Sequence, residues 1–124
     1  MHAKSTIITI VYTLAAVLFR EREFVVIVAD TESQAALFLG QIKQILEDSK
    51  HIQELFGLKV GEKGLVYEKD TDTDFIIQFS DMTKFRIIAK GAEQKLRGML
   101  AGYGKRPDLV VIDDLLNEEL VANK

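Results

Sequence analysis

An uninterrupted run of apolar residues, FVVIVA at positions 24–29, constrains the fold of this chain most strongly. A strand with one face in water alternates apolar and polar residues, whereas a strand covered on both faces is apolar throughout. Most of the run is β-branched, which favours a strand over a helix. We therefore predict a buried strand within a mostly parallel sheet, since parallel sheets are covered on both faces.

Helices are predicted before and after this strand in the sequence. Residues 5–19 contain no glycine, proline or charged side chain, and the charged quartet at 20–23 follows them as an exposed helix end. Such a helix is apolar almost all round, as expected when it is buried between a sheet and other elements. After the strand, Thr31 opens a capping-box pattern for a second helix, and a short third helix over 51–56 is predicted to end at Gly57.

The second half of the chain mixes strands with loops. Residues 58–74 are rich in glycine and charge and predict a surface excursion with one short strand. Two β-like runs with a short polar break predict an antiparallel hairpin over 75–89. A glycine-rich loop is predicted over 91–105, and an apolar strand over 109–112 is followed by two acids. Strands and helices therefore alternate, which predicts an α/β fold.

Length and composition bound the possible functions. The 124 residues predict one domain, 1–124, and 48% of them are hydrophobic. The absence of cysteine excludes a disulfide scaffold and a thiolate metal site, and two histidines make zinc chemistry remote. With a net charge of −3 and a pI of 5.4, the chain lacks the overall positive charge that attracts a phosphate backbone, so any nucleic-acid contact must be local. The apolar stretch over 7–19 is shorter than the roughly 20 residues of a membrane span, so we expect no membrane partner.

Two short polar motifs predict phosphate chemistry. Lys4, Ser5 and Thr6 open the first predicted helix, where a lysine reaches β- and γ-phosphates, a hydroxyl ligates Mg²⁺ and helix amides bind the same anion. Asp113 and Asp114 follow the last predicted strand, where one acid can hold Mg²⁺ and the other can orient a water. The alternation of strands and helices brings both motifs to one edge of a parallel sheet. Each motif alone also fits a plainer role, as a solvated helical turn and as a helix cap.

The chain resembles the ATPase domain of tailed-phage terminase large subunits, the motors that drive viral DNA into a procapsid. The resemblance is carried by HAKST at 2–6, VVIVADTESQA at 25–35, KLRG at 95–98 and RPDLVVIDD at 106–114, and it spans nearly the whole chain. It implies a P-loop NTPase-like fold of the additional-strand type, a three-layer sandwich around a mostly parallel sheet. It also implies ATP and Mg²⁺ as cofactors.

The resemblance assigns a role to each matching residue. Lys4 would be the phosphate lysine, Ser5 the Mg²⁺ hydroxyl and Thr6 a supporting hydroxyl. Asp113 would be the acid of the Mg²⁺ shell, and Asp114 the carboxylate that activates water. The implied partners are double-stranded DNA, the portal protein, the small terminase subunit and further copies of the chain, in the cytoplasm of the host cell.

Arg97 matches the place where terminases keep an arginine that can reach the γ-phosphate held by a neighbouring subunit. The plainer alternative is a solvated arginine in a glycine-rich loop. Lys90, Lys95, Lys105 and Arg106 lie near it in the sequence, and this basic cluster fits either contact with DNA phosphates or a purely solubilising loop.

The sequence departs from the family pattern at two places. The family has a strand and glycine or arginine residues before the phosphate lysine, whereas this chain begins at Met1, and Leu116 stands where the family often has Glu. We therefore expect a single partial ATPase domain that lacks the first strand, turns over weakly or not at all, and self-associates through the sheet edge left open. Two alternatives are a non-catalytic interaction or scaffold domain with this fold, and another P-loop motor such as a helicase.

Overall fold

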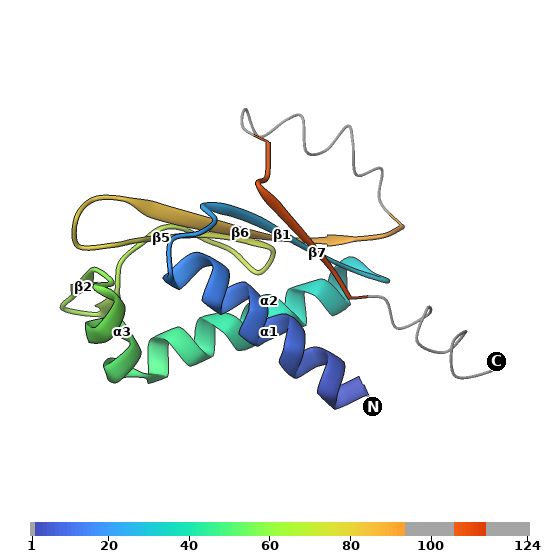
Figure 1. Cartoon of the computed structure of the whole chain (residues 1–124), viewed down its shortest axis with the longest axis horizontal. Coiled ribbons are helices and arrows are strands. Elements are labelled where there is room, and N and C mark those ends of the chain that lie inside the picture. The colour runs from blue at the N-terminus through green and yellow to red at the C-terminus, as the bar shows by residue number, and fades with distance from the viewer. Residues whose placement is uncertain (1, 94–105, 114–124) are drawn as a thin grey trace.

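The computed structural model describes residues 2–93 and 106–113, with side chains from residue 7 onward (Figure 1). The elements are, in chain order, α1 (His2–Leu18), β1 (Phe24–Ala29), α2 (Glu32–Asp48), α3 (Lys50–Phe56), β2 (Val60–Gly61), β3 (Gly64–Leu65), β4 (Tyr67–Asp70), β5 (Asp74–Gln78), β6 (Lys84–Gly91) and β7 (Leu109–Ile112). All three helices that the sequence predicts are present, as are the strands at both apolar runs.

The main sheet has five strands in the order β4-β5-β6-β1-β7. β1 pairs in parallel with β6 and with β7, whereas β5 pairs antiparallel with β4 and β6. The fold is therefore α/β, as predicted, with a mixed sheet that is parallel from β6 through β1 to β7 and antiparallel from β4 through β5 to β6. The predicted hairpin corresponds to β5 and β6. β4 lies within the stretch predicted as a surface excursion, yet it forms an edge of the sheet.

β1 is the central element of the core. All six of its residues are buried, as the sequence predicts for a strand covered on both faces. Val25, Ile27 and Ala29 point into the main core cluster, together with side chains of the three helices and of β5 and β6. Phe24, Val26 and Val28 form a smaller cluster with Ile88 on the opposite face.

The described helices all lie on one side of the sheet (Figure 1). The part of the chain that the structure describes therefore forms two layers, and the second helical layer of the predicted sandwich is not among these residues. Thr31 caps α2 by accepting the amide of Gln34, and Gly57 ends α3 in the left-handed conformation at φ +71°. None of the described helices combines the length and the apolar character needed to cross a membrane.

α1 packs on the sheet with one side and exposes apolar residues on the other. Thr9, Thr13 and Val17 are buried on its inner side. Its outer face and the turn that follows it carry large apolar side chains that are 54–65% exposed: Ile7, Ile8, Val11 and Tyr12 on the helix, and Phe19 directly after its last residue. We call these five residues the α1 outer face. The sequence predicts a helix buried on all sides, and the described residues cover only one of them.

Candidate functional site

Three strand ends and two helix starts meet at one edge of the molecule. β6, β1 and β7 are parallel, so their carboxyl ends lie at the same edge of the sheet. α1 precedes β1 and α2 follows it, and Figure 1 shows the first turns of both helices on the side where these strands end. In α/β proteins, ligands bind outside the carboxyl ends of parallel strands, and helix N-termini there attract anions.

Asp113 ties the end of β7 to α1. Its backbone N–H donates to the carbonyl of Val28 at 2.7 Å, and its side chain is buried, with the residue 3% exposed. Thr9 Oγ1 donates to Asp113 Oδ1 at 3.3 Å across 104 residues of sequence. Thr9 lies one helical turn after Ser5, so this contact joins the predicted metal acid to the helix that carries the predicted phosphate lysine.

The other predicted site residues are placed only in part. Lys4, Ser5 and Thr6 lie within α1, as predicted, but their side chains are outside the described part of the structure. Asp114 and Arg97 lie outside the described residues altogether. The backbone of the first motif is therefore part of α1, and the side chain of Asp113 contacts the same helix through Thr9.

The start of α2 already holds a carboxylate from this chain. Glu93 Oε1 accepts the N–H of Glu32, the first residue of α2, at 2.9 Å. Gly91 makes this approach possible, because a Cβ there would lie 2.4 Å from the Glu32 nitrogen. The first turn of α1 is therefore the helix start that we consider for an external anion.

Asp108 fixes β7 against β1, a role that the sequence interpretation missed. Its two carboxylate oxygens accept the amides of Glu23 and Phe24 at 2.9 and 3.0 Å. Its own N–H donates to the carbonyl of Phe24 at 2.9 Å. An acid directly before an apolar strand was the available signal for this contact, whereas no local signal distinguishes Thr9 from the other threonines of α1.

The described donor at this edge is one buried carboxylate, that of Asp113. The described residues contain no cluster of three or more His, Cys, Asp or Glu side chains that could hold a metal ion. Mg²⁺ in nucleotide sites takes one or two protein oxygens and completes its shell with phosphate and water. Asp113, bonded to a hydroxyl of α1, supplies an oxygen of that kind.

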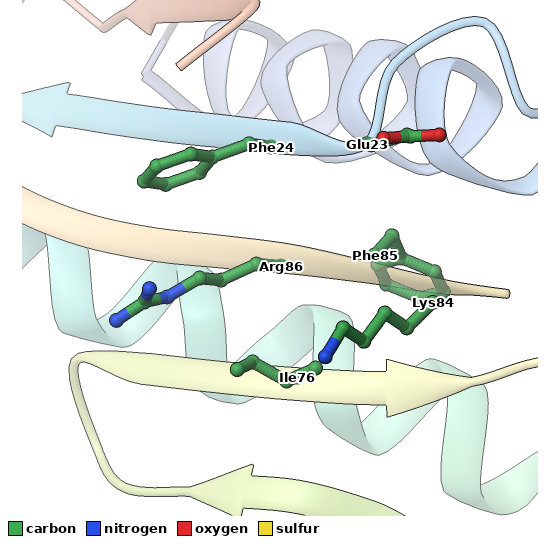
Figure 2. Close-up of a pocket in the computed structure, with 6 residues that line it drawn as sticks. All are labelled: Glu23, Phe24, Ile76, Lys84, Phe85 and Arg86. Atoms are coloured by element: carbon green, nitrogen blue, oxygen red, sulfur yellow. The ribbon is translucent and has the colours of Figure 1, made fainter. Parts of the chain in front are cut away.

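A separate pocket lies near the opposite ends of the parallel strands. It measures about 200 Å³ and is lined by Glu23, Phe24, Ile76, Lys84, Phe85 and Arg86, shown in Figure 2. Arg86 binds Asp74 through Nε and Nη2 at 2.9 and 2.6 Å, and Lys84 pairs with Glu68 at 2.9 Å. Both cations therefore pair with acids of this chain, and the pocket is distinct from the predicted phosphate site.

The charged residues beside this pocket lower the pKa of one carboxyl group, that of Asp74. Burial acts to raise the pKa of Asp74, but the hydrogen bonds and charges of Arg86 and Lys69 outweigh it and hold the pKa below its usual value. Lys69 Nζ lies 2.9 Å from Asp74 Oδ2. Asp74 therefore remains ionised and joins strands β4, β5 and β6.

No protein-family model matches the chain, and no curated protein or solved structure shows a significant similarity to it.

Proposed function

We propose that this chain binds Mg²⁺-ATP where α1 begins and β7 ends, as the ATPase domain of a viral DNA-packaging motor of the terminase type. The observation that carries the proposal is the buried hydrogen bond from Thr9 to Asp113. It supports a shared site for two motifs that are more than 100 residues apart in the sequence. The order of the motifs along the chain is its second support.

The roles of the residues follow from their chemistry. The first amides of α1, with Lys4, would hold the phosphates, while Ser5 and Asp113 would hold Mg²⁺, with Thr6 as a neighbouring hydroxyl. Mg²⁺, when bound, supplies charge neutralisation on the β- and γ-phosphates. Thr9 keeps one carboxylate oxygen of Asp113 directed at α1.

The wider reaction belongs to the same proposal. Asp114 would orient the attacking water, and Arg97 would reach the γ-phosphate held by a neighbouring subunit. Double-stranded DNA, the portal protein and the small terminase subunit would be the partners of the assembled motor in the host cytoplasm.

Calorimetric titration of Mg²⁺-ATP into the full chain tests this site. We expect saturable binding, weakened about tenfold or more by Lys4→Ala because one charge-assisted contact to phosphate is lost. Asp113→Asn should lower affinity in Mg²⁺ but leave affinity in EDTA unchanged. Lys63→Ala, which removes an exposed lysine from the β2–β3 turn, is the matched control and should bind as the parent does.

Absence of binding in the parent chain, or equal binding by Lys4→Ala and Lys63→Ala, would contradict the nucleotide site. A non-catalytic interaction domain would then be the better proposal. The exposed α1 outer face is the specific observation that favours it.

A further inference from the structure

We propose that a small hollow at the end of α1 binds a phosphate group. It lies between the turn that follows α1 and the turn that leads into β6, and its volume is about 60 Å³. Three cationic side chains line it: Arg20, Arg22 and Lys84. We call it the α1-end hollow. α1 has 17 residues and is therefore about 25 Å long, so this hollow is separate from the nucleotide site proposed at the helix start and does not depend on it.

The size and the floor of the α1-end hollow suit one small anion. Its volume is several times the roughly 10–15 Å³ that one water needs, but less than a third of the 200 Å³ of the pocket in Figure 2. A phosphate group fits such a space, whereas a whole nucleotide does not. The floor consists of Val17, Phe79 and Phe85, which are at most 2% exposed. An apolar floor keeps water from one side and so strengthens the attraction between an anion and the cations around it.

Arg20 is held in place by the turn between β5 and β6. Its Nη1 donates to Asp81 Oδ2 at 2.5 Å and to Thr83 Oγ1 at 3.0 Å, and its guanidinium carbon lies 4.0 Å from the centre of the Phe79 ring. Its backbone is left-handed, at φ +63°, a conformation that costs energy in a residue other than glycine. The Nε–H and the two N–H groups of Nη2 make no hydrogen bond with the described residues, so a fixed guanidinium keeps donors for a ligand.

Arg22 and Lys84 supply the other two cations. The backbone N–H of Arg22 donates to the Ala16 carbonyl at 3.0 Å, but its exposed guanidinium forms no ion pair with the described residues. Lys84 pairs with Glu68 at 2.9 Å, and their side chains are 53% and 41% exposed. Exposed pairs of this kind are weak, so the ammonium group of Lys84 is able to bind a second anion.

The acids nearby lie mostly outside the hollow. Asp81 and Glu68, the partners of two of its cations, are not among the residues that line it, and neither is Glu21. Glu23 is the one acid among the described lining residues, against three cations. A phosphate group presents three acceptor oxygens in different directions, whereas a carboxylate presents two in one plane. Three cations from two separate turns therefore favour phosphate as the ligand.

Proton–nitrogen NMR of the full chain during titration with sodium phosphate tests the proposal. The Nε–H signals of Arg20 and Arg22 should shift together and saturate, with a dissociation constant of about 1–10 mM, because exposed ion pairs are weak. Sodium chloride keeps the ionic strength constant during the titration. Absent shifts, shifts without saturation, or equal shifts in chloride alone would overturn the proposal.

Arg22→Ala is the decisive variant, because Arg22 is exposed and its side chain has no other contact to lose among the described residues. It should weaken phosphate binding, measured at the Arg20 signal, about fivefold or more. Lys63→Ala removes a charge from the β2–β3 turn, outside the hollow, and should change the dissociation constant less than about twofold. Equal effects of the two variants would assign the binding to overall charge and overturn the site. Lys4→Ala should leave this titration unchanged even where it abolishes ATP binding, so the two sites are judged separately.

Fluorescence anisotropy with a labelled DNA duplex distinguishes two sources of the phosphate group, the DNA backbone and the free ion. If the source is the backbone, Arg22→Ala should weaken duplex binding and reduce the slope of log affinity against log salt by about one, whereas Lys63→Ala should not. If the source is the free ion, Arg22→Ala should change the NMR titration alone. An Arg22→Ala variant that matches the parent chain in both measurements would contradict a phosphate site in the α1-end hollow.

Discussion

Two threonines on the inner side of α1 are both buried but differ in their hydrogen bonding. Thr9 donates to Asp113, whereas Thr13 Oγ1 has no hydrogen-bond partner among the described residues. A buried hydroxyl that loses its contact with water and gains no partner costs stability, and one bonded to a carboxylate contributes to it. These two positions, one helical turn apart, therefore form a matched pair for mutation.

Thr9→Val should lower the free energy of unfolding by about 1–3 kcal/mol, because it leaves a carboxylate oxygen of Asp113 without its hydroxyl donor. Thr13→Val has the same shape change and should raise the free energy of unfolding by about 1 kcal/mol, because it removes an unsatisfied hydroxyl. Urea titrations followed by circular dichroism measure both values. Equal losses in the two variants would mean that side-chain shape, and not hydrogen bonding, decides the effect.

At the scale of residues, the sequence predicted the acid at the end of β7 but not the side chain that holds it. Asp113 was predictable because it directly follows an apolar strand. Thr9 was not, because its partner is 104 residues away and a threonine in an apolar helix commonly bonds its own backbone. The predicted side-chain roles of Lys4, Ser5, Thr6, Asp114 and Arg97 stay predictions.

The junction of β6 with α2 depends on one glycine. A Cβ on Gly91 would lie 2.4 Å from the backbone nitrogen of Glu32 and 1.7 Å from Glu93 Oε1. The glutamate side chain can move away, but the first residue of α2 is held by the helix. Gly40, in the exposed middle of α2, has no atom within 4 Å of the same position.

Gly91→Ala should therefore lower the melting temperature and cost about 1–3 kcal/mol, since the start of α2 must shift away from β6. Gly40→Ala should stabilise the chain by about 0.5–1 kcal/mol, because alanine loses less backbone entropy in a helix. Thermal unfolding of both variants measures whether the melting temperature falls for Gly91→Ala and rises for Gly40→Ala. An unchanged melting temperature for Gly91→Ala would show that the start of α2 can shift without loss of stability.

At the scale of elements, local pattern predicted the helices and the apolar strands, and it failed for β4. Thr31, Gly57 and the run in β1 act through neighbours in the sequence, so their effect is readable without a structure. β4 is a four-residue strand with three exposed residues, and its pairing with β5 decides its conformation. The antiparallel pairing of β5 with β6 was predicted, because a short polar break joins the two runs, whereas the pairing of β4 with β5 was not, since it is set by tertiary contacts.

For the whole molecule, the ion network around Asp74 links three strands of the antiparallel half. Lys69 belongs to β4, Asp74 to β5 and Arg86 to β6. The residue Asp74 is 6% exposed, so removal of its charge leaves a half-buried guanidinium without its bidentate partner. The stability of the entire sheet should therefore depend on the ionisation of this one carboxyl group.

Because the pKa of Asp74 is lowered in the folded chain, its ionised form stabilises the fold at neutral pH. That contribution is present above the unfolded-state pKa of about 3.9 and is lost as the pH falls through the lower folded-state pKa. Asp74→Asn should cost about 1–3 kcal/mol at pH 7, and the difference from the parent should shrink below about pH 4. Asp72→Asn, in the exposed loop before β5, should show no such dependence. A constant difference between parent and Asp74→Asn across this range would contradict the assignment.

The pairing of β7 with β1 also has a consequence for synthesis on the ribosome. Phe24 and Asp108, which fix this pair, are 84 residues apart, whereas all other described strands and helices are complete by Gly91. Closing so long a segment is slow compared with forming local contacts. During translation the first four strands of the sheet and the helices beneath them are therefore available to fold first. Among the described strands β7 is the last to emerge, and it docks on a surface that already exists, so Asp113 and the edge it completes form after the rest of the described candidate site.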